Sequence, residues 1–344
     1  MKYFITTLLL AINSFLSISQ NVDLDMIDSK TSKLLRKEFN NKNIICLGEF
    51  EHGWENIIET KCGIVKFLFD TLGYRNIIFE GSFIDGFMEE KEIYQEKRWN
   101  KNTQFDAWAS PSVFKLISYL KQTYPEMSYY GCDIQDLPTQ QFSSYLANFI
   151  KPVSSSLAED AQKKDSLCSY LFKEIDFRPK KEAANIEVFF QKLLNTILIN
   201  RDKLKTQNSD YEIVVQCIKN RIWLCKALQT KYYSGFFKSR DLYNGANIEW
   251  ILNQYENKSS NTKTIIWAAD AHIDKKLSWS NSMIEVLPEE IKQQIYAISI
   301  LNAKNTYTPY QCVNKLKYNK KINTKSFDAV ISVSDKKKLI IHKN

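Results

Sequence analysis

The sequence predicts an α/β fold with a central, mostly parallel sheet flanked by helices and a helical insertion in the middle of the chain. Three observations predict it: short apolar runs that end at a carboxylate or glycine, helical patterns between them, and one long stretch without strand character. With 344 residues, 44% of them hydrophobic, the chain can bury a sizeable core. We expect one domain over residues 20–344.

Residues 1–19 have the features of a secretory signal peptide. Lys2 precedes an apolar stretch, and the small residues Ser17 and Ser19 lie near its end. Polar residues interrupt this stretch, which is also short for a bilayer span. We therefore expect export to the periplasm or the extracellular space, with no stable membrane insertion after the leader is removed.

The net charge of +8 is concentrated at the two ends of the chain. Residues 315–344 hold nine Lys and two Asp, and the leader holds one Lys, so the remaining chain is about neutral. A nucleic-acid-binding face would need the positive excess spread over a surface, so we expect no nucleic-acid partner. The seven cysteines contain no Cys-x-x-Cys pair and lie mostly in apolar or helical runs, as core residues do.

The first expected strand, residues 44–47, leads into an unusual turn. Glu49, Glu51 and His52 follow it directly, and apolar residues at helical spacing then predict a helix. Core strands seldom end in so many ionisable groups. Further strands are expected at residues 76–79, 128–132, 264–268, 295–300, 327–333 and 339–342.

Between about residues 139 and 238 the sequence has no convincing strand. The stretch is rich in Lys, Glu, Gln and Asn, and its apolar residues recur at helical spacing. We interpret it as a helical insertion that covers one side of the sheet. The alternation of helix and strand returns after it.

Four of the expected strands run into an acid at or just past their carboxyl ends. The acids are Glu49, Glu80, Asp133 and Asp270, and the histidines His52 and His272 follow the first and the last of these strands. Ligands of open parallel sheets bind beyond the carboxyl ends of the strands, so neighbouring strands would bring these groups together. Burying such charges is costly unless they are paired or functional.

These residue types favour acid–base chemistry. A neutral imidazole can take a proton from water, and a carboxylate that fixes its tautomer improves it as a base. The sequence contains no Gly-x-Ser-x-Gly elbow, His-Glu-x-x-His motif, P-loop or dinucleotide glycine fingerprint. Carboxylates and histidines also bind metals, so the residues alone leave a metal-dependent hydrolase open.

Several blocks of the sequence resemble the erythromycin esterase family. Its opening signature is similar to Leu47-Gly48-Glu49, His52-Gly53, Glu55 and Lys61, followed by Phe79-Glu80 and Phe83. Its Gly-x-Asp-x-Gln segment is similar to residues 130–135, and its later blocks match Arg240, Asp241, Asn247, Trp267, Ala271 and His272. The resemblance covers about residues 40–333, with a weak match in the helical middle.

The resemblance implies an exported hydrolase of ester or lactone bonds that works without a metal or other cofactor. His52 would act as the general base on water, and Glu49 and Glu80 would orient it or hold the substrate. His272 would help to stabilise the oxyanion. The substrate would be a small-molecule ester or lactone, the protein a monomer, and antibiotic resistance a role that the family suggests.

Five further residues are expected at the substrate: Lys61, Arg240, Glu51, Asp133 and Asp270. Three positions depart from the family pattern, because Ala269 replaces a usual histidine, Asp270 an asparagine and Glu51 a small polar residue. The lost histidine removes a candidate oxyanion donor, and the added acids disfavour an anionic transition state. The missing histidine leaves open a periplasmic small-molecule or haem-binding protein on the same scaffold. The carboxylates and histidines leave open a metal-dependent hydrolase.

Overall fold

The structure of the protein is a computed structural model. It describes residues 27–50, 52–96, 110–135, 140–173, 180–256, 263–277, 280–302, 326–333 and 339–343. The expected leader, residues 1–19, lies outside the described residues. Within these ranges no helix has both the length and the apolar character needed to cross a membrane.

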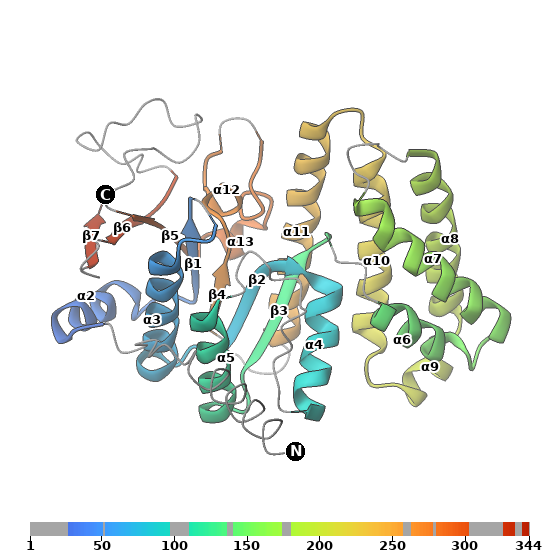
Figure 1. Cartoon of the computed structure of the whole chain (residues 1–344), viewed down its shortest axis with the longest axis horizontal. Coiled ribbons are helices and arrows are strands. Elements are labelled where there is room, and N and C mark those ends of the chain that lie inside the picture. Colours follow the sequence, from blue (N-terminus) through green and yellow to red (C-terminus); the bar gives the residue numbers. More distant parts are fainter. Residues whose placement is uncertain are drawn as a thin grey trace, which may run out of the picture.

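Seven strands form one sheet in the order β3-β2-β4-β1-β5-β6-β7 (Figure 1). The strands are β1 (Ile44–Glu49), β2 (Asn76–Ser82), β3 (Ser128–Asp133), β4 (Thr264–Trp267), β5 (Ile295–Asn302), β6 (Ala329–Val333) and β7 (Leu339–Lys343). Neighbouring strands are parallel except β6 and β7, which are antiparallel. The predicted α/β fold with a mostly parallel sheet is confirmed.

The four strands that lead into the predicted acids are neighbours in this sheet. Thr264 at the start of β4 pairs with Ile44 of β1 on one side and with Asn76 of β2 on the other. Asn76 in turn pairs with Ser128, the first residue of β3. The strands therefore start at one level and run in one direction, and their carboxyl ends meet at the same edge.

Helices cover both faces of the sheet, as the crossovers of a parallel sheet require. One face carries α2 (Ser29–Phe39), α3 (Glu55–Leu72) and α5 (Pro111–Thr123), and the other carries α4 (Phe83–Glu96) and α11 (Tyr233–Glu256). Side chains of a strand alternate between the two cores. In β1, Ile45 and Leu47 pack with α3, whereas Cys46 packs with the opposite core.

The predicted helical insertion is confirmed, but it does not cover the sheet directly. It consists of α6 (Gln140–Ile150), α7 (Ser155–Lys173), α8 (Lys180–Ile199), α9 (Arg201–Gln207) and α10 (Tyr211–Leu228). Figure 1 shows α4 and α11 between the sheet and these helices, and α10 packs against both. The insertion therefore forms an outer layer, because α4 and α11 already occupy the apolar face of β2 and β3.

Two short helices, α12 (Asp270–Ile273) and α13 (Glu289–Lys292), lie in the connection from β4 to β5. α12 begins three residues after β4 and packs against β1. It therefore holds Asp270 and His272 at the carboxyl edge of the sheet.

Candidate active site

The carboxyl edge of the sheet gathers the predicted acids and both predicted histidines. Glu49 ends β1, Glu80 lies in β2, Asp133 ends β3, His52 lies before α3, and Asp270 and His272 lie in α12. Most of these residues fall into two groups. The first is built on Glu49 and the second on Glu80.

The first group consists of Glu49, His52 and Lys61. Nδ1 of His52 lies 2.9 Å from Oε1 of Glu49, and the ammonium group of Lys61 forms an ion pair with the other carboxylate oxygen. Lys61 also donates a 3.1 Å hydrogen bond to the carbonyl oxygen of Ala268. Because Lys61 is fully buried while the His52 side chain is 45% exposed, the group runs from the core to the surface.

The position of Lys61 differs from the one expected at the substrate. Lys61 lies on the buried face of α3, one turn from Ile57 and Val65, which are both core residues. Its Nζ atom is directed at Glu49 and lies 4.9 Å from the ring centroid of Trp267. Burial lowers the pKa of Lys61 well below its usual range, and the charges of Asp270 and Glu80 oppose this shift. Lys61 therefore acts on the site by holding the Glu49 carboxylate.

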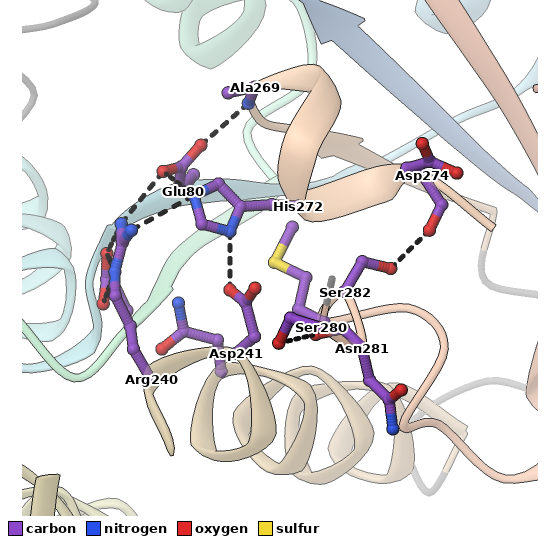
Figure 2. Close-up of polar contacts among 12 residues, drawn as sticks. Glu80, Arg240, Asp241, Ala269, His272, Asp274, Ser280, Asn281 and Ser282 are labelled. Atoms are coloured by element: carbon purple, nitrogen blue, oxygen red, sulfur yellow. Dashed lines mark hydrogen bonds and ion pairs between the residues drawn. The ribbon is translucent and has the colours of Figure 1, made fainter. Parts of the chain in front are cut away.

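The second group consists of Glu80, Asp133, Arg240 and His272. Arg240 places Nε 2.9 Å from Oδ2 of Asp133 and Nη2 2.9 Å from Oε1 of Glu80. The same Glu80 oxygen lies 2.9 Å from Nε2 of His272. The other Glu80 oxygen accepts a 2.7 Å hydrogen bond from the backbone N–H of Ala269, as Figure 2 shows. Both oxygens of Glu80 are therefore fixed.

His272 is held between two carboxylates (Figure 2). Its Nδ1 lies 2.5 Å from Oδ1 of Asp241 on α11, and its Nε2 faces Glu80. Burial opposes a charge on the ring, but Glu80 and Asp241 outweigh it and raise the pKa of His272 to about 10. Burial likewise opposes ionisation of Glu80, yet His272 and Arg240 hold the pKa of this carboxyl well below its usual range. The raised pKa favours a protonated His272 ring, and Nη1 of Arg240 lies 3.1 Å from the same Nε2.

The pKa of His52 shifts in the opposite direction. Partial burial lowers the pKa of His52; the Glu80 carboxylate opposes this shift, and the positive charges of His272 and Arg240 reinforce it. The charges of the second group therefore act on the His52 ring. The site thus has a half-exposed imidazole with a lowered pKa and a buried imidazole with a raised one.

The Asp270 side chain contacts Gly48 of β1 and Ser299 of β5. The hydroxyl group of Ser299 donates a 2.6 Å hydrogen bond to Oδ2 of Asp270, and Oδ1 packs so tightly on Gly48 that a Cβ atom there would collide with it. Burial raises the pKa of Asp270 to about 7, although Ser299 and Lys61 oppose the shift. This placement differs from the predicted one, in which Asp270 contacts the substrate.

The other residues predicted at the substrate have different positions. Arg240 and Asp133 are 7% and 4% exposed, respectively; they pair with each other, and Arg240 also contacts Glu80 and His272. Glu51 lies outside the described residues. No group of three or more His, Cys, Asp or Glu side chains in the described part of the chain is arranged to hold a metal ion.

Asp241 is a site residue that the strand-end pattern did not reveal. It lies on α11 directly after Arg240, and it reaches His272 from the helix rather than from the sheet. Adjacent residues of a helix do not face each other, so the Arg240-Asp241 sequence does not by itself indicate a site. The one sequence feature that pointed to Asp241 was its match, together with Arg240, to a block of the erythromycin esterase family.

This arrangement suits acid–base hydrolysis. A neutral imidazole held in one tautomer by a carboxylate is a base for water, and buried cations nearby can stabilise a developing oxyanion. The fold and the site together define an α/β protein with histidine–carboxylate pairs at the carboxyl edge of its sheet.

The family model of erythromycin esterase matches residues 70–331, which is more than half of the chain. The chain belongs to the erythromycin esterase family, which confirms the resemblance seen in the sequence. The matched region begins after the first group, so Glu49, His52 and Lys61 precede it.

Individual proteins are also similar to this chain. The hydrolase candidate YbfO of Bacillus subtilis (strain 168) is 25% identical over 318 residues, which cover 82% of this chain and 70% of YbfO. A Bacillus cereus crystal structure superposes with a TM-score of 0.67 at 19% identity, covering 86% of this chain and 76% of that chain. A mutant of erythromycin esterase EreC in its open conformation gives a TM-score of 0.62 at 15% identity, covering 80% and 74%. These two structures share the fold.

Proposed function

We propose that this protein hydrolyses carboxylic ester or lactone bonds of a small molecule, with His52 as the general base. The observation that carries the proposal is the pairing of His52 Nδ1 with Glu49 at 2.9 Å on a half-exposed ring. With Nδ1 protonated and directed at Glu49, the lone pair resides on Nε2. A lowered pKa keeps that lone pair available at neutral pH.

In the proposed reaction, Nε2 of His52 takes a proton from water as the oxygen attacks the carbonyl carbon. The resulting oxyanion is stabilised by the positive charge of His272 and Arg240. The acyl C–O bond then breaks, and the leaving alcohol receives the proton from His52. Glu80 holds His272 and Arg240 in place, because its carboxylate contacts both.

We propose that this reaction takes place outside the cytoplasm and that the protein acts as a monomer without a nucleic-acid partner. The apolar leader at residues 1–19 supports export, and the near-neutral body of the chain supports a small-molecule partner. Cell fractionation of the full chain, compared with a chain lacking the leader, tests the location.

The activity is tested with a panel of aryl esters, alkyl esters and lactones. Wild-type protein is compared with His52→Ala and with the control His342→Ala, whose position lies on the edge strand β7. We expect hydrolysis that falls about 10²- to 10⁴-fold in His52→Ala and is unchanged in the control. Matching circular dichroism spectra would show an intact fold. Full activity of His52→Ala would refute the proposal, and loss of wild-type activity in EDTA would favour a metal-dependent reaction.

A further inference from the structure

Two buried cysteines meet in the outer helical layer, on helices that carry none of the site residues described above. Sγ of Cys168 on α7 lies 3.6 Å from Sγ of Cys225 on α10. Neither side chain has exposed surface, and 57 positions separate them in the sequence. Figure 1 shows α7 and α10 side by side in this layer, and the two helices are in contact.

A buried ion pair sets the register of these helices. Arg221 of α10 donates a 2.6 Å hydrogen bond from Nε to Oδ1 of Asp165 on α7, and both side chains are almost fully buried. Ser143 of α6 donates a 2.7 Å hydrogen bond to the other Asp165 oxygen. Such a pair tolerates little displacement, because losing one partner would leave a buried charge without compensation.

The cysteines lie one helical turn beyond this ion pair on both helices. Cys168 follows Asp165 by three residues, and Cys225 follows Arg221 by four. Residues spaced three or four apart lie on one face of a helix. The face of each helix that carries its partner in the ion pair therefore also carries its cysteine. The contact between the thiols is therefore a consequence of the helix register.

We infer that Cys168 and Cys225 are a disulfide-forming pair that covalently joins α7 to α10 when an oxidised thiol donor is present. A disulfide has an S–S distance of about 2.05 Å, so the sulfurs must approach by roughly 1.5 Å, a shift within reach of side-chain rotation. The inference goes beyond the proposed hydrolysis and is independent of it. Export, as proposed above, would supply the oxidising environment in which such bonds persist.

The bond forms by exchange with a donor disulfide of the glutathione type. The thiolate of one cysteine attacks the donor, whose S–S bond breaks and releases one donor thiolate. The thiolate of the second cysteine then attacks the protein sulfur of the mixed disulfide and releases the second donor thiolate. The two cysteine sulfurs lose two electrons to the donor, and their two protons go to the two donor thiolates. Because the folded sulfurs are buried, exchange precedes the final closure of α7 on α10.

The test is refolding of the full chain with glutathione and glutathione disulfide, followed by alkylation in denaturant and tryptic digestion without reductant. The two cysteines fall in separate tryptic peptides, residues 165–173 and 222–226. We expect these peptides to be recovered as one cross-linked species that reductant separates. Recovery of both peptides in the alkylated form would overturn the inference.

A second measurement separates a disulfide from two packed thiols. Reductant should lower the Tm of the wild-type protein by roughly 5 °C and leave the Tm of the double variant Cys168→Ser/Cys225→Ser unchanged. The control Cys217→Ser changes another buried cysteine of α10 and should keep both the cross-link and the effect of reductant. An equal Tm of the wild-type protein with and without reductant would contradict the inference.

Discussion

Lys61 has no exposed surface, and its ammonium group pairs with the Glu49 carboxylate that also holds His52. The pair anchors the candidate general base to the core. A buried ion pair adds little to the free energy of unfolding, but removal of one partner leaves the other charge buried without compensation.

Lys61→Met should therefore lower the free energy of unfolding by about 3–5 kcal/mol. Lys66→Met is the matched control on the same helix, because Lys66 forms a 2.7 Å pair with Asp70 that is partly exposed. The control should cost at most about 1 kcal/mol. Urea denaturation of both variants measures the difference, and adding Glu49→Gln to Lys61→Met should recover part of the loss. Equal effects of the two lysine substitutions would contradict the assignment.

Gly48→Ala should destabilise the protein because the added methyl group meets both the Asp270 carboxylate and the side chain of Ile273. We expect a loss of about 3 kcal/mol or more, measured as a lower Tm. Gly53→Ala is the comparison: its φ of 86° strains an alanine, but the site has open space, so the cost should stay near 1 kcal/mol. If Asp270→Ala fails to relieve any of the Gly48→Ala loss, the close approach is not its cause.

Asp241→Asn should lower the pKa of His272, because the substitution keeps the side-chain shape and removes one of the two carboxylates that hold its proton. The chain has three histidines, so a proton NMR titration of their imidazole signals can resolve each one. We expect the His272 titration to move down from about 10 while that of His52 changes little. An unchanged His272 titration would show that Asp241 does not act on it.

His272 should also make stability depend on pH. Its pKa is raised from 6.5 to about 10 in the folded state, so its contribution is fully present below about pH 6.5 and is lost as the pH rises through about 10. The Tm difference between wild-type protein and His272→Gln should therefore be larger at pH 6.5 than at pH 10. A His342→Gln control should show no such trend. A Tm difference that increases with pH would contradict the stabilising role of the protonated His272 ring.

Much of the fold could be predicted from local patterns. An apolar run that ends at an acid marked β1, β2 and β3, and the parallel direction of neighbouring strands then brought Glu49, Glu80 and Asp133 to one edge. The strand order was not predictable in this way, because the pairing of β4 between β1 and β2 depends on contacts far apart in the sequence.

The limits of the site prediction have two physical origins. Lys61 was placed at the substrate through its match to the family signature, although its spacing from Ile57 and Val65 already indicated the buried face of α3. Asp241 lies on α11, and nothing in its local sequence shows that this helix packs across the carboxyl edge of the sheet. Helix positions depend on tertiary packing, whereas strand ends carry their own pattern.

The central claim is that His52 acts as a neutral base, and the pH dependence of kcat/KM for an ester that the protein hydrolyses tests it most directly. Because the pKa of His52 is lowered from 6.5, activity should rise with pH through an acid limb whose midpoint lies below pH 6.5. The pKa of this limb should equal the one that NMR assigns to His52. An acid limb that persists unchanged in His52→Asn would contradict the account.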